Sequence, residues 1–534
     1  MSKFFKVLAL TLSLVMALSF TGCGKKAAPG AVDSSTAKLG TSYPLETDET
    51  LTYWIPINEN ITASVSEFGE TEFAKKAEEL TGVKVEYRSP AIGQSTEQFN
   101  LMLASGDLPD IIEHGWFEFP GGPAKAIKDG YIIPLNDTFA AYAPNLTAFL
   151  KEHPEDADKM IKTDEGTYYL FPMVRDGEKL LITAGPIVRT DLLEKYSIEE
   201  PETFDEWYDM LVTFKNNGIE IPLAFNATST YEIENLFRVF GSPTGYYRDG
   251  DTVKYAPFEP EFKETLTMLT KWFSEGLIDK NFTTTDSKIR EANMLSGKIG
   301  VTYGSGGGQL GKWIQALPAD SEIKLGTLTF PTKTADEKGA KYKPITWPYS
   351  GSGSAISTAC KNVELAAKYL DFFYSEEGHM LANFGIEGES YTMVDGQPKY
   401  TEKITNNPDG LSMSQAMAMY MRSYSAGTMI QDQRYIEQYY ALPQQQQALV
   451  DWAEEVKYTD SFLLPRVLPT ADEASEMAEI KNNSDTYRDN MILKFITGIE
   501  PLENFDKFVE QLKAYNVEKG IEINQAAYDR YLAR

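Results

Sequence analysis

One stretch of the chain limits the possible folds more than any other: residues 101–135, with the sequence LMLASGDLPDIIEHGWFEFPGGPAKAIKDGYIIPL. Its start continues an apolar helical stripe, and the Ala-Ser-Gly-Asp that follows ends a helix. In the LPDII segment the proline fits only the start of a strand, and the paired isoleucines suit a strand buried on both faces. Glu113, His114 and Trp116 come directly afterwards. Ligands bind at the carboxyl ends of strands in open α/β sheets, so a binding site is expected here. The alternative is a core strand that runs into a surface loop with a half-buried Trp116.

Strands and helices alternate on both sides of this stretch. Residues 51–55, 71–80 and 83–87 predict a strand, a helix and a strand. A second such unit starts at residue 180, and Thr203 with Glu206 predicts a capping box before helix 205–216. Strand–helix–strand order favours a parallel sheet whose loops share one edge, so Asn58 is expected beside Trp116. The predicted fold class is α/β.

Length and charge narrow the class of protein. A chain of 534 residues is too long for one ordinary core, so two or more lobes are expected. Its 78 acidic and 50 basic residues give a formal charge of −28, which argues against a nucleic-acid partner. The three histidines and two cysteines lack zinc-site spacing. We therefore expect no cofactor and no metal.

The first 22 residues predict a processing signal. Lys3 and Lys6 precede an apolar run over residues 7–20. The Phe-Thr-Gly-Cys that ends at Cys23 resembles a bacterial lipobox, which implies lipidation of Cys23; ordinary cleavage or a simple membrane anchor is the alternative. Residues 23–48 are expected to form a flexible tether. With Cys23 lipidated, Cys360 has no disulfide partner. We expect an outward-facing lipoprotein of the Gram-positive type, anchored to the cell membrane.

Several motifs carry a family resemblance. They are SGDLPDIIEHGW with DGYIIPL downstream, the Pro-x-Thr-x-x-Glu-Trp at residues 201–207, NFGIEGESY at residues 383–391, and the last 40 residues. Together they resemble the family 1 extracellular solute-binding proteins, which are of the maltodextrin-binding type, in the lipoprotein branch that binds aldouronates or oligosaccharides. The resemblance implies a two-lobed periplasmic-binding-protein-like type II fold with a hinge and two crossings between the lobes. Lobe 1 would hold residues 49–175 with roughly 345–390, and lobe 2 residues 176–344 with roughly 391–534.

The resemblance also implies a function. The chain would be the monomeric, non-enzymatic, substrate-binding component of an ABC importer that delivers an oligosaccharide to the permease. A sugar site needs flat aromatic faces and planar hydrogen-bonding groups. The expected aromatic residues are Trp116 from one lobe, Tyr231 and Tyr303 from the other, and Trp347 and Tyr349 near a crossing. The expected hydroxyl partners are Asn58, Glu113 and His114. Arg422 and Tyr424 are weaker candidates for the cleft.

One departure from the family and two other functions complete the expectations. Many of these relatives carry a calcium loop where this chain has only Phe-Lys-Asn-Asn-Gly-Ile-Glu at residues 214–220, which offers too few oxygen ligands. A peptide-binding or adhesin-type surface lipoprotein is one alternative. A surface glycoside hydrolase is the other, and it would need two carboxylates that flank the cleft.

Overall fold

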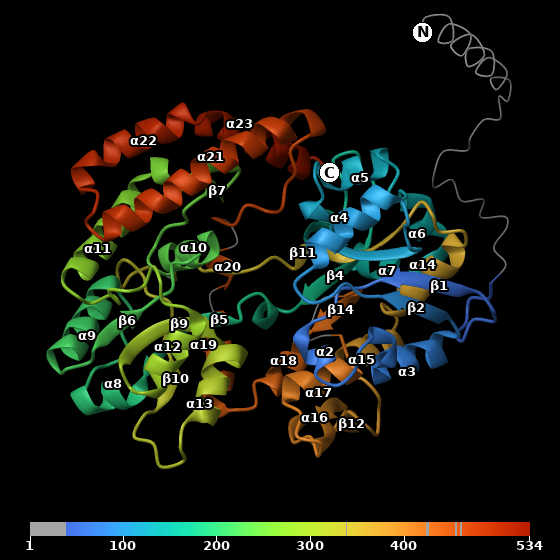
Figure 1. Ribbon diagram of the computed structural model, residues 1–534, viewed down its shortest axis with the longest axis horizontal. Coiled ribbons are helices and arrows are strands. Elements are labelled where there is room, and N and C mark those ends of the chain that lie inside the picture. Colours follow the sequence, from blue (N-terminus) through green and yellow to red (C-terminus); the bar gives the residue numbers. More distant parts are fainter. Residues whose placement is uncertain (1–38, 338, 423–426, 454–455, 460–461) are drawn as a thin grey trace, which may run out of the picture.

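The computed structural model describes residues 39–337, 339–422, 427–453, 456–459 and 462–534. The expected signal peptide, Cys23, the first part of the tether and Tyr424 lie outside the described residues. The described chain forms two α/β lobes that lie side by side (Figure 1). Each lobe has its own main sheet and its own hydrophobic core. No described helix is both long enough and apolar enough to cross a membrane.

The first lobe is built on a six-stranded sheet in the order β14-β4-β11-β3-β1-β2. The strands are β1 (Thr50–Trp54), β2 (Lys84–Arg88), β3 (Ile111–Gly115), β4 (Phe171–Asp176), β11 (Tyr349–Ile356) and β14 (Met429–Asp432). β1 pairs in parallel with β2 and β3, so these strands end at one edge, as the strand–helix–strand order predicted. β3 begins at Ile111, three residues later than expected. The Asp110 carboxylate before it accepts hydrogen bonds from the Thr52 amide and hydroxyl at 2.8 and 2.7 Å.

Helices pack around this sheet. They are α2 (Glu59–Thr62), α3 (Glu72–Thr81), α4 (Ser95–Ser105), α5 (Gly122–Lys128), α6 (Asn136–Tyr142), α7 (Pro144–Glu152), α14 (Val363–Phe372), α15 (Glu376–Phe384), α16 (Glu402–Thr405), α17 (Met413–Tyr420) and α18 (Gln433–Tyr439), with the hairpin β12 (Tyr391–Val394) and β13 (Gln397–Tyr400). The helix predicted over residues 71–80 is α3. The Thr71 side chain caps its first turn, and Gly82 ends it at φ 73°.

The second lobe has a four-stranded sheet in the order β10-β5-β9-β6. These strands are β5 (Ala184–Arg189), β6 (Ile221–Ala224), β9 (Ile299–Ser305) and β10 (Leu325–Thr327), and β7 (Tyr246–Asp249) with β8 (Thr252–Tyr255) forms a hairpin. Its helices are α8 (Thr190–Tyr196), α9 (Phe204–Asn216), α10 (Thr230–Val239), α11 (Pro260–Ser274), α12 (Ser287–Leu295), α13 (Lys312–Ala316), α19 (Pro443–Ala453) and α20 (Val456–Thr459). The capping box of Thr203 and Glu206 at α9 is confirmed.

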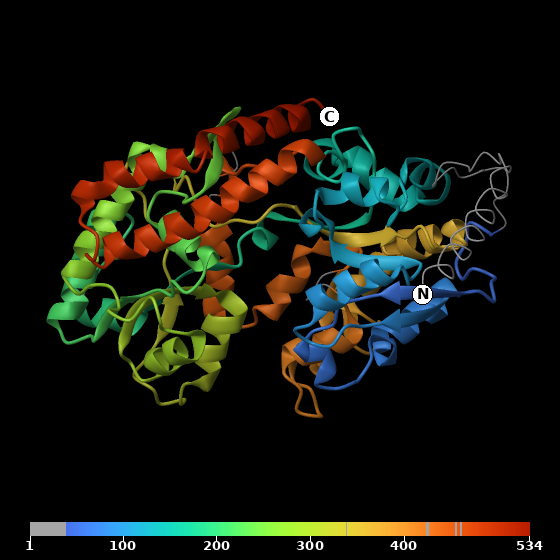
Figure 2. The same ribbon diagram turned by 45° about the horizontal axis from the view of Figure 1, so that its top comes forward.

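Three C-terminal helices, α21 (Ala471–Ile496), α22 (Phe505–Ala514) and α23 (Val517–Leu532), cover one side of the second lobe (Figure 2). The end of α23 reaches the first lobe. Arg530 lies 2.6 Å from one oxygen of Asp164, and Arg534 pairs with the other oxygen. These contacts fasten the two lobes together on one side of the molecule.

The expected boundary of the first lobe needs a correction. Residues 391–534 were predicted to belong to lobe 2, but β14 pairs in parallel with β4, and α17 contacts α2 and α3. Residues up to Asp432 therefore belong with the first sheet. A strand of only four residues can join either sheet, and the partner of β14 lies about 250 residues away, so the local sequence does not specify the pairing.

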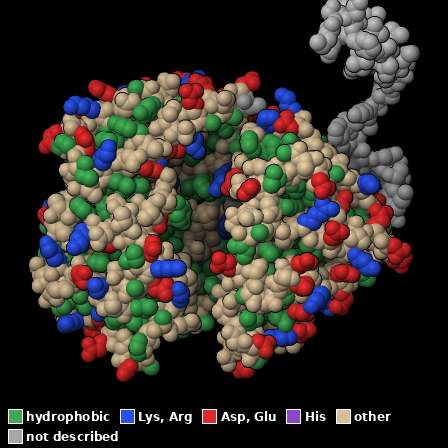
Figure 3. Space-filling view, in the orientation of Figure 1, with side chains coloured by type: hydrophobic (Ala, Val, Ile, Leu, Met, Phe, Trp, Pro, Cys, Tyr) green, Lys and Arg blue, Asp and Glu red, His purple; other side chains and the backbone are tan. Residues whose placement is uncertain are grey.

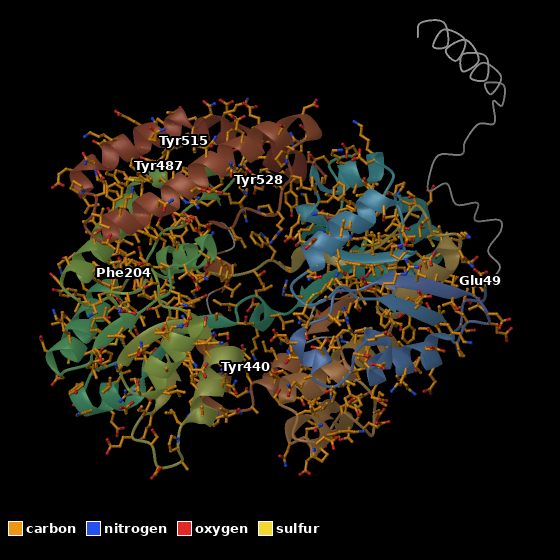
Figure 4. All side chains as sticks on the ribbon, in the orientation of Figure 1. Glu49, Phe204, Tyr440, Tyr487, Tyr515 and Tyr528 are labelled. Carbon is orange, nitrogen blue, oxygen red and sulfur yellow. The ribbon has the colours of Figure 1, made fainter. Side chains whose placement is uncertain are left out.

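Within the described residues, three segments connect the lobes, not two. They lie between β4 and β5, between β10 and β11, and between α18 and α19. Tyr440 stands in the third segment (Figure 4), and its hydroxyl donates to the carbonyl of Thr183 in the first segment at 3.2 Å. Two of the connections are thus bonded to each other where they pass between the lobes.

Candidate functional site between the lobes

A pocket of about 480 Å³ lies between the lobes, within the hollow that Figure 3 shows. The first lobe contributes residues from a short helix, η3 (Trp116–Glu118), and from the start of α5. The second contributes residues from α10, β7, α21 and α23, and the segment 463–469 forms a further wall. The lining residues used below are Phe117, Phe119, Arg238, Tyr246, Trp347, Arg466 and Lys481. The pocket therefore draws on parts of the chain that are more than 300 residues apart.

Phe117, and not Trp116, faces this pocket. Trp116 is 0% exposed, and its ring packs edge-on against Phe99 of α4 at 6.0 Å between ring centroids. The prediction of Trp116 as a sugar platform is therefore wrong. The chain enters the helical turn η3 directly after β3, and this turn directs Trp116 into the core and the next residue, Phe117, outward.

Trp347 lies at the pocket, in the segment between β10 and β11. The Arg466 guanidinium lies over its ring, 5.4 Å from the centroid. Behind it, Arg175 of β4 donates to the Trp347 carbonyl at 3.2 Å. The Trp347 indole nitrogen is buried and has no hydrogen-bond partner in the part of the chain that the structure describes. The structure thus places Trp347 where the sequence analysis expected an aromatic residue, beside a crossing.

Tyr349 has a different role from the one expected. Its side chain is 1% exposed, and its hydroxyl lies 3.1 Å from that of Tyr169. Burial raises the pKa of Tyr349 well above its usual value. Tyr349 begins β11 and points into the first-lobe core, so the prediction that it binds ligand is corrected.

A smaller pocket of about 250 Å³ brings together three predicted residues, Asn58, Glu113 and His114. They meet because β1 and β3 are parallel neighbours, and the residues that follow them lie at the same sheet edge. The Asn58 side-chain oxygen caps α2 by accepting from the Asn60 and Ile61 amides at 3.0 and 3.3 Å. Ser352 of β11 completes the polar lining.

Glu113 forms a buried ion pair in this pocket. One oxygen lies 2.7 Å from the Arg422 guanidinium, and the other accepts from the Tyr53 hydroxyl at 3.0 Å. Burial raises the pKa of Glu113, while the charge of Arg422 opposes the rise. Each carboxylate oxygen has one partner and Glu113 still lines the pocket, so its contact with a sugar hydroxyl stays a prediction. Arg422, a weaker candidate, holds this carboxylate in place.

His114 is half-buried and stacks on Phe99, with 3.8 Å between ring centroids and 18° between ring planes. Burial lowers its pKa to about 4, so the imidazole is neutral at pH 7. A neutral imidazole has one donor and one acceptor nitrogen, which suits a sugar hydroxyl. Its contact with ligand stays a prediction.

The two tyrosines expected from the second lobe differ from each other. Tyr303 of β9 is 8% exposed and stacks on Phe225 at 5.9 Å, so its ring is part of the core and the prediction for it is corrected. Tyr231, in the first turn of α10, is 71% exposed. It does not line the interlobe pocket, and its role as a platform stays a prediction.

Four lining residues were not predicted from the sequence: Phe117, Arg238, Arg466 and Lys481. One signal was present for Arg466. It is a single charge in Leu-Leu-Pro-Arg-Val-Leu-Pro, an apolar segment whose two prolines exclude a regular helix. Arg238 lies on α10 and Lys481 on α21, and both reach the pocket only through the way distant parts of the chain pack together.

Two α/β lobes joined by several segments, with a pocket between them, form an arrangement that can close around a ligand by hinge motion. The family model described as "Bacterial extracellular solute-binding protein" matches residues 58–380, and the chain belongs to this family.

Relatives with known names cover most of the chain. It is 25% identical to the fructooligosaccharide ABC transporter substrate-binding protein FusA of Streptococcus pneumoniae, over 99% of both chains. It is 25% identical to the lipoprotein LipO of Bacillus subtilis over 65% of this chain and 69% of LipO. The solved structure of the alginate-binding protein AlgQ2 without calcium ion matches with a TM-score of 0.70 and 26% identity, covering 90% of this chain and 99% of AlgQ2.

Proposed function

We propose that this chain is the substrate-binding component of an ABC importer, which captures an oligosaccharide between its lobes and delivers it to the permease. The observation that carries the proposal is the interlobe pocket, to which both lobes contribute and in which Phe117 and Trp347 offer aromatic faces. The similarity to FusA, a fructooligosaccharide-binding component of an ABC transporter, over nearly the full length of both chains supports it.

The chemistry of the pocket fits a sugar. Pyranose and furanose rings present apolar C–H faces, which pack on aromatic side chains, and hydroxyls, which need planar hydrogen-bonding groups. Phe117 and Trp347 supply aromatic faces for the apolar side of a sugar ring. Asn58 and His114, in the neighbouring pocket, supply hydrogen-bonding groups for the sugar hydroxyls. A ligand that contacts both lobes favours the closed arrangement by its differential affinity, and the permease then recognises the closed form.

Lipid anchoring through Cys23 is part of the proposal. The support is the sequence pattern before Cys23 and the similarity to the lipoprotein LipO. Metabolic labelling with a fatty acid is expected to mark the full chain in the membrane fraction, and Cys23→Ser is expected to lose both the label and the membrane association. A Cys23→Ser protein that still carries label would refute the assignment.

The binding proposal is tested by isothermal titration calorimetry of the purified protein with oligosaccharides of defined length. Trp347→Ala and Phe117→Ala are each expected to weaken binding by about tenfold or more, because each removes an aromatic face. Tyr515→Ala, directly after α22 and away from the pocket (Figure 4), is the aromatic control and is expected to leave affinity unchanged.

The same samples distinguish the alternatives. New reducing ends after incubation would identify a glycoside hydrolase. Binding of peptides in place of every sugar would favour a peptide-binding lipoprotein. Sugar binding without cleavage is the result that the proposal requires.

A further inference from the structure

The interlobe pocket has a charge opposite to that of the whole chain. The described residues that line it include Arg238, Arg466 and Lys481 but no Asp or Glu, although the chain has 78 acidic and only 50 basic residues. The three cations come from separate elements: α10, the segment before α21, and α21 itself. The pocket therefore has positive charge on more than one wall.

Two guanidinium groups in and beside the pocket flank Trp347. Arg466 lies over the indole ring, and it makes no hydrogen bond or ion pair with any described residue. Arg175 is bonded to the Trp347 carbonyl and has no carboxylate partner among the described residues. Burial and, to a smaller extent, the nearby charge of Arg466 lower the pKa of Arg175. Two like charges thus lie close together, and the described residues offer neither of them a carboxylate.

Arg238 adds a third guanidinium group from α10 of the second lobe. Its Nε donates to Glu234, which also accepts from the Thr244 amide at 2.7 Å. Its Nη1 is buried and has no partner in the described chain. Lys481 is exposed and forms no ion pair with a described residue. Glu234 offsets one positive charge at this wall, and no carboxylate of the described residues pairs with Arg466 or Lys481.

Closure of the lobes makes the guanidinium groups of the pocket discriminate between neutral and acidic ligands. When a ligand excludes water from the pocket, an unpaired guanidinium loses its hydration, which is unfavourable unless a new acceptor replaces the water. A neutral sugar offers hydroxyls only. A carboxylate offers two oxygens in the planar geometry that matches the guanidinium fork.

We propose that the ligand of the interlobe pocket is an acidic oligosaccharide, whose uronic-acid carboxylate pairs with Arg466 while its sugar ring packs on Trp347. This inference rests on the proposed function and adds the class of sugar. Similarity alone does not choose this class, because the relatives named above include a fructooligosaccharide-binding and an alginate-binding protein.

The test compares ligands that differ only in charge. Oligogalacturonates of three to five residues and the same oligosaccharides as methyl esters are titrated into the purified protein by calorimetry. Neutral fructo- and malto-oligosaccharides and a sulfated oligosaccharide of similar length complete the panel. We expect the free acids to bind at least tenfold more tightly than their esters, with an affinity that falls as the salt concentration rises.

Variants connect the effect to the pocket. Arg466→Gln is expected to weaken binding of the acids at least tenfold and binding of neutral sugars less than twofold. Arg466→Lys is expected to recover part of the affinity because it keeps the charge. Lys288→Gln removes an exposed charge on α12, outside the lining of the pocket, and is the control with no expected change.

Each other outcome has a distinct meaning. If esters or neutral oligosaccharides bind as tightly as the acids, the charge inference fails and the proposed function stands. If only the sulfated oligosaccharide binds, the carboxylate assignment fails. If Arg466→Gln binds the acids like the unmodified protein, the assignment to Arg466 fails. If no oligosaccharide binds, the proposed function fails and this inference fails with it.

Discussion

The burial of His114 predicts a measurable pH dependence of stability. Its folded pKa is about 4, against an ordinary value of 6.5, so between these values the unfolded chain binds the proton and the folded chain does not. Stability that is present above pH 6.5 is therefore lost as the pH falls toward 4, and below about 4 the loss attributable to this residue stops. At pH 4.5 the difference between the two pKa values lowers the free energy of unfolding by about 2.5 kcal/mol. At pH 7 the same difference lowers it by only a small part of that amount.

The measurement is urea unfolding, followed by tryptophan fluorescence, at pH 7.0 and pH 4.5. The comparison is between the unmodified protein and His114→Phe, in which a ring of similar size can stack on Phe99 but cannot titrate. Contributions of the carboxylates are common to both proteins and cancel in the difference. The unmodified protein is expected to lose about 2.5 kcal/mol more than the variant between the two pH values. Losses that agree within about 0.5 kcal/mol would show that His114 titrates normally in the folded protein, and the reasoning from burial would fail.

Three further predictions concern other features of the fold. Arg422→Met should lower the free energy of unfolding by about 3–5 kcal/mol, because it leaves Glu113 buried without its cation. Adding Glu113→Leu should restore most of that loss, and a double variant that shows no recovery would contradict this account. Calcium or EDTA should shift the melting temperature by less than about 1 °C, because the loop at residues 214–220 has too few oxygen ligands for a calcium site. A larger calcium-dependent shift would identify a calcium site elsewhere in the protein. Asp164→Asn should lower the free energy of unfolding in urea by about 2 kcal/mol, because it weakens the ion pair with Arg530 that joins the lobes. An unchanged midpoint of the urea transition would show that this ion pair contributes little.

The sequence predicted local structure well because local structure depends on neighbouring residues. The helix over residues 71–80, the capping box at Thr203 and the strand that opens the first sheet all follow from chemistry within a few positions. Trp116 was predicted to face the pocket, whereas Phe117 does, and this difference shows the limit of prediction from local sequence. A single helical turn after β3 decides which of two adjacent aromatic residues faces the pocket, and composition does not encode that register.

The nonlocal features could not be read in the same way. β14 joins the first sheet through a partner about 250 residues earlier, and Arg466 reaches Trp347 from more than 100 residues away. Tyr303 has the flat aromatic side chain expected of a residue that stacks on a sugar ring, but its ring stacks on Phe225 instead. Such contacts depend on how distant segments pack, so the sequence indicated the family and the approximate edge of the site but not most of its side chains.

The three connections between the lobes restrict how the molecule can move. A change in the angle between the lobes must alter backbone torsion angles in all three segments together. Two of the segments join a strand of one sheet to a strand of the other, and the third joins α18, which directly follows β14, to α19, which contacts β10. This coupling leaves essentially one rotation axis, and sliding or twisting of one lobe past the other is suppressed. Spin labels placed on the two sheets should therefore report distances that all vary along a single coordinate, whichever pair of positions is chosen.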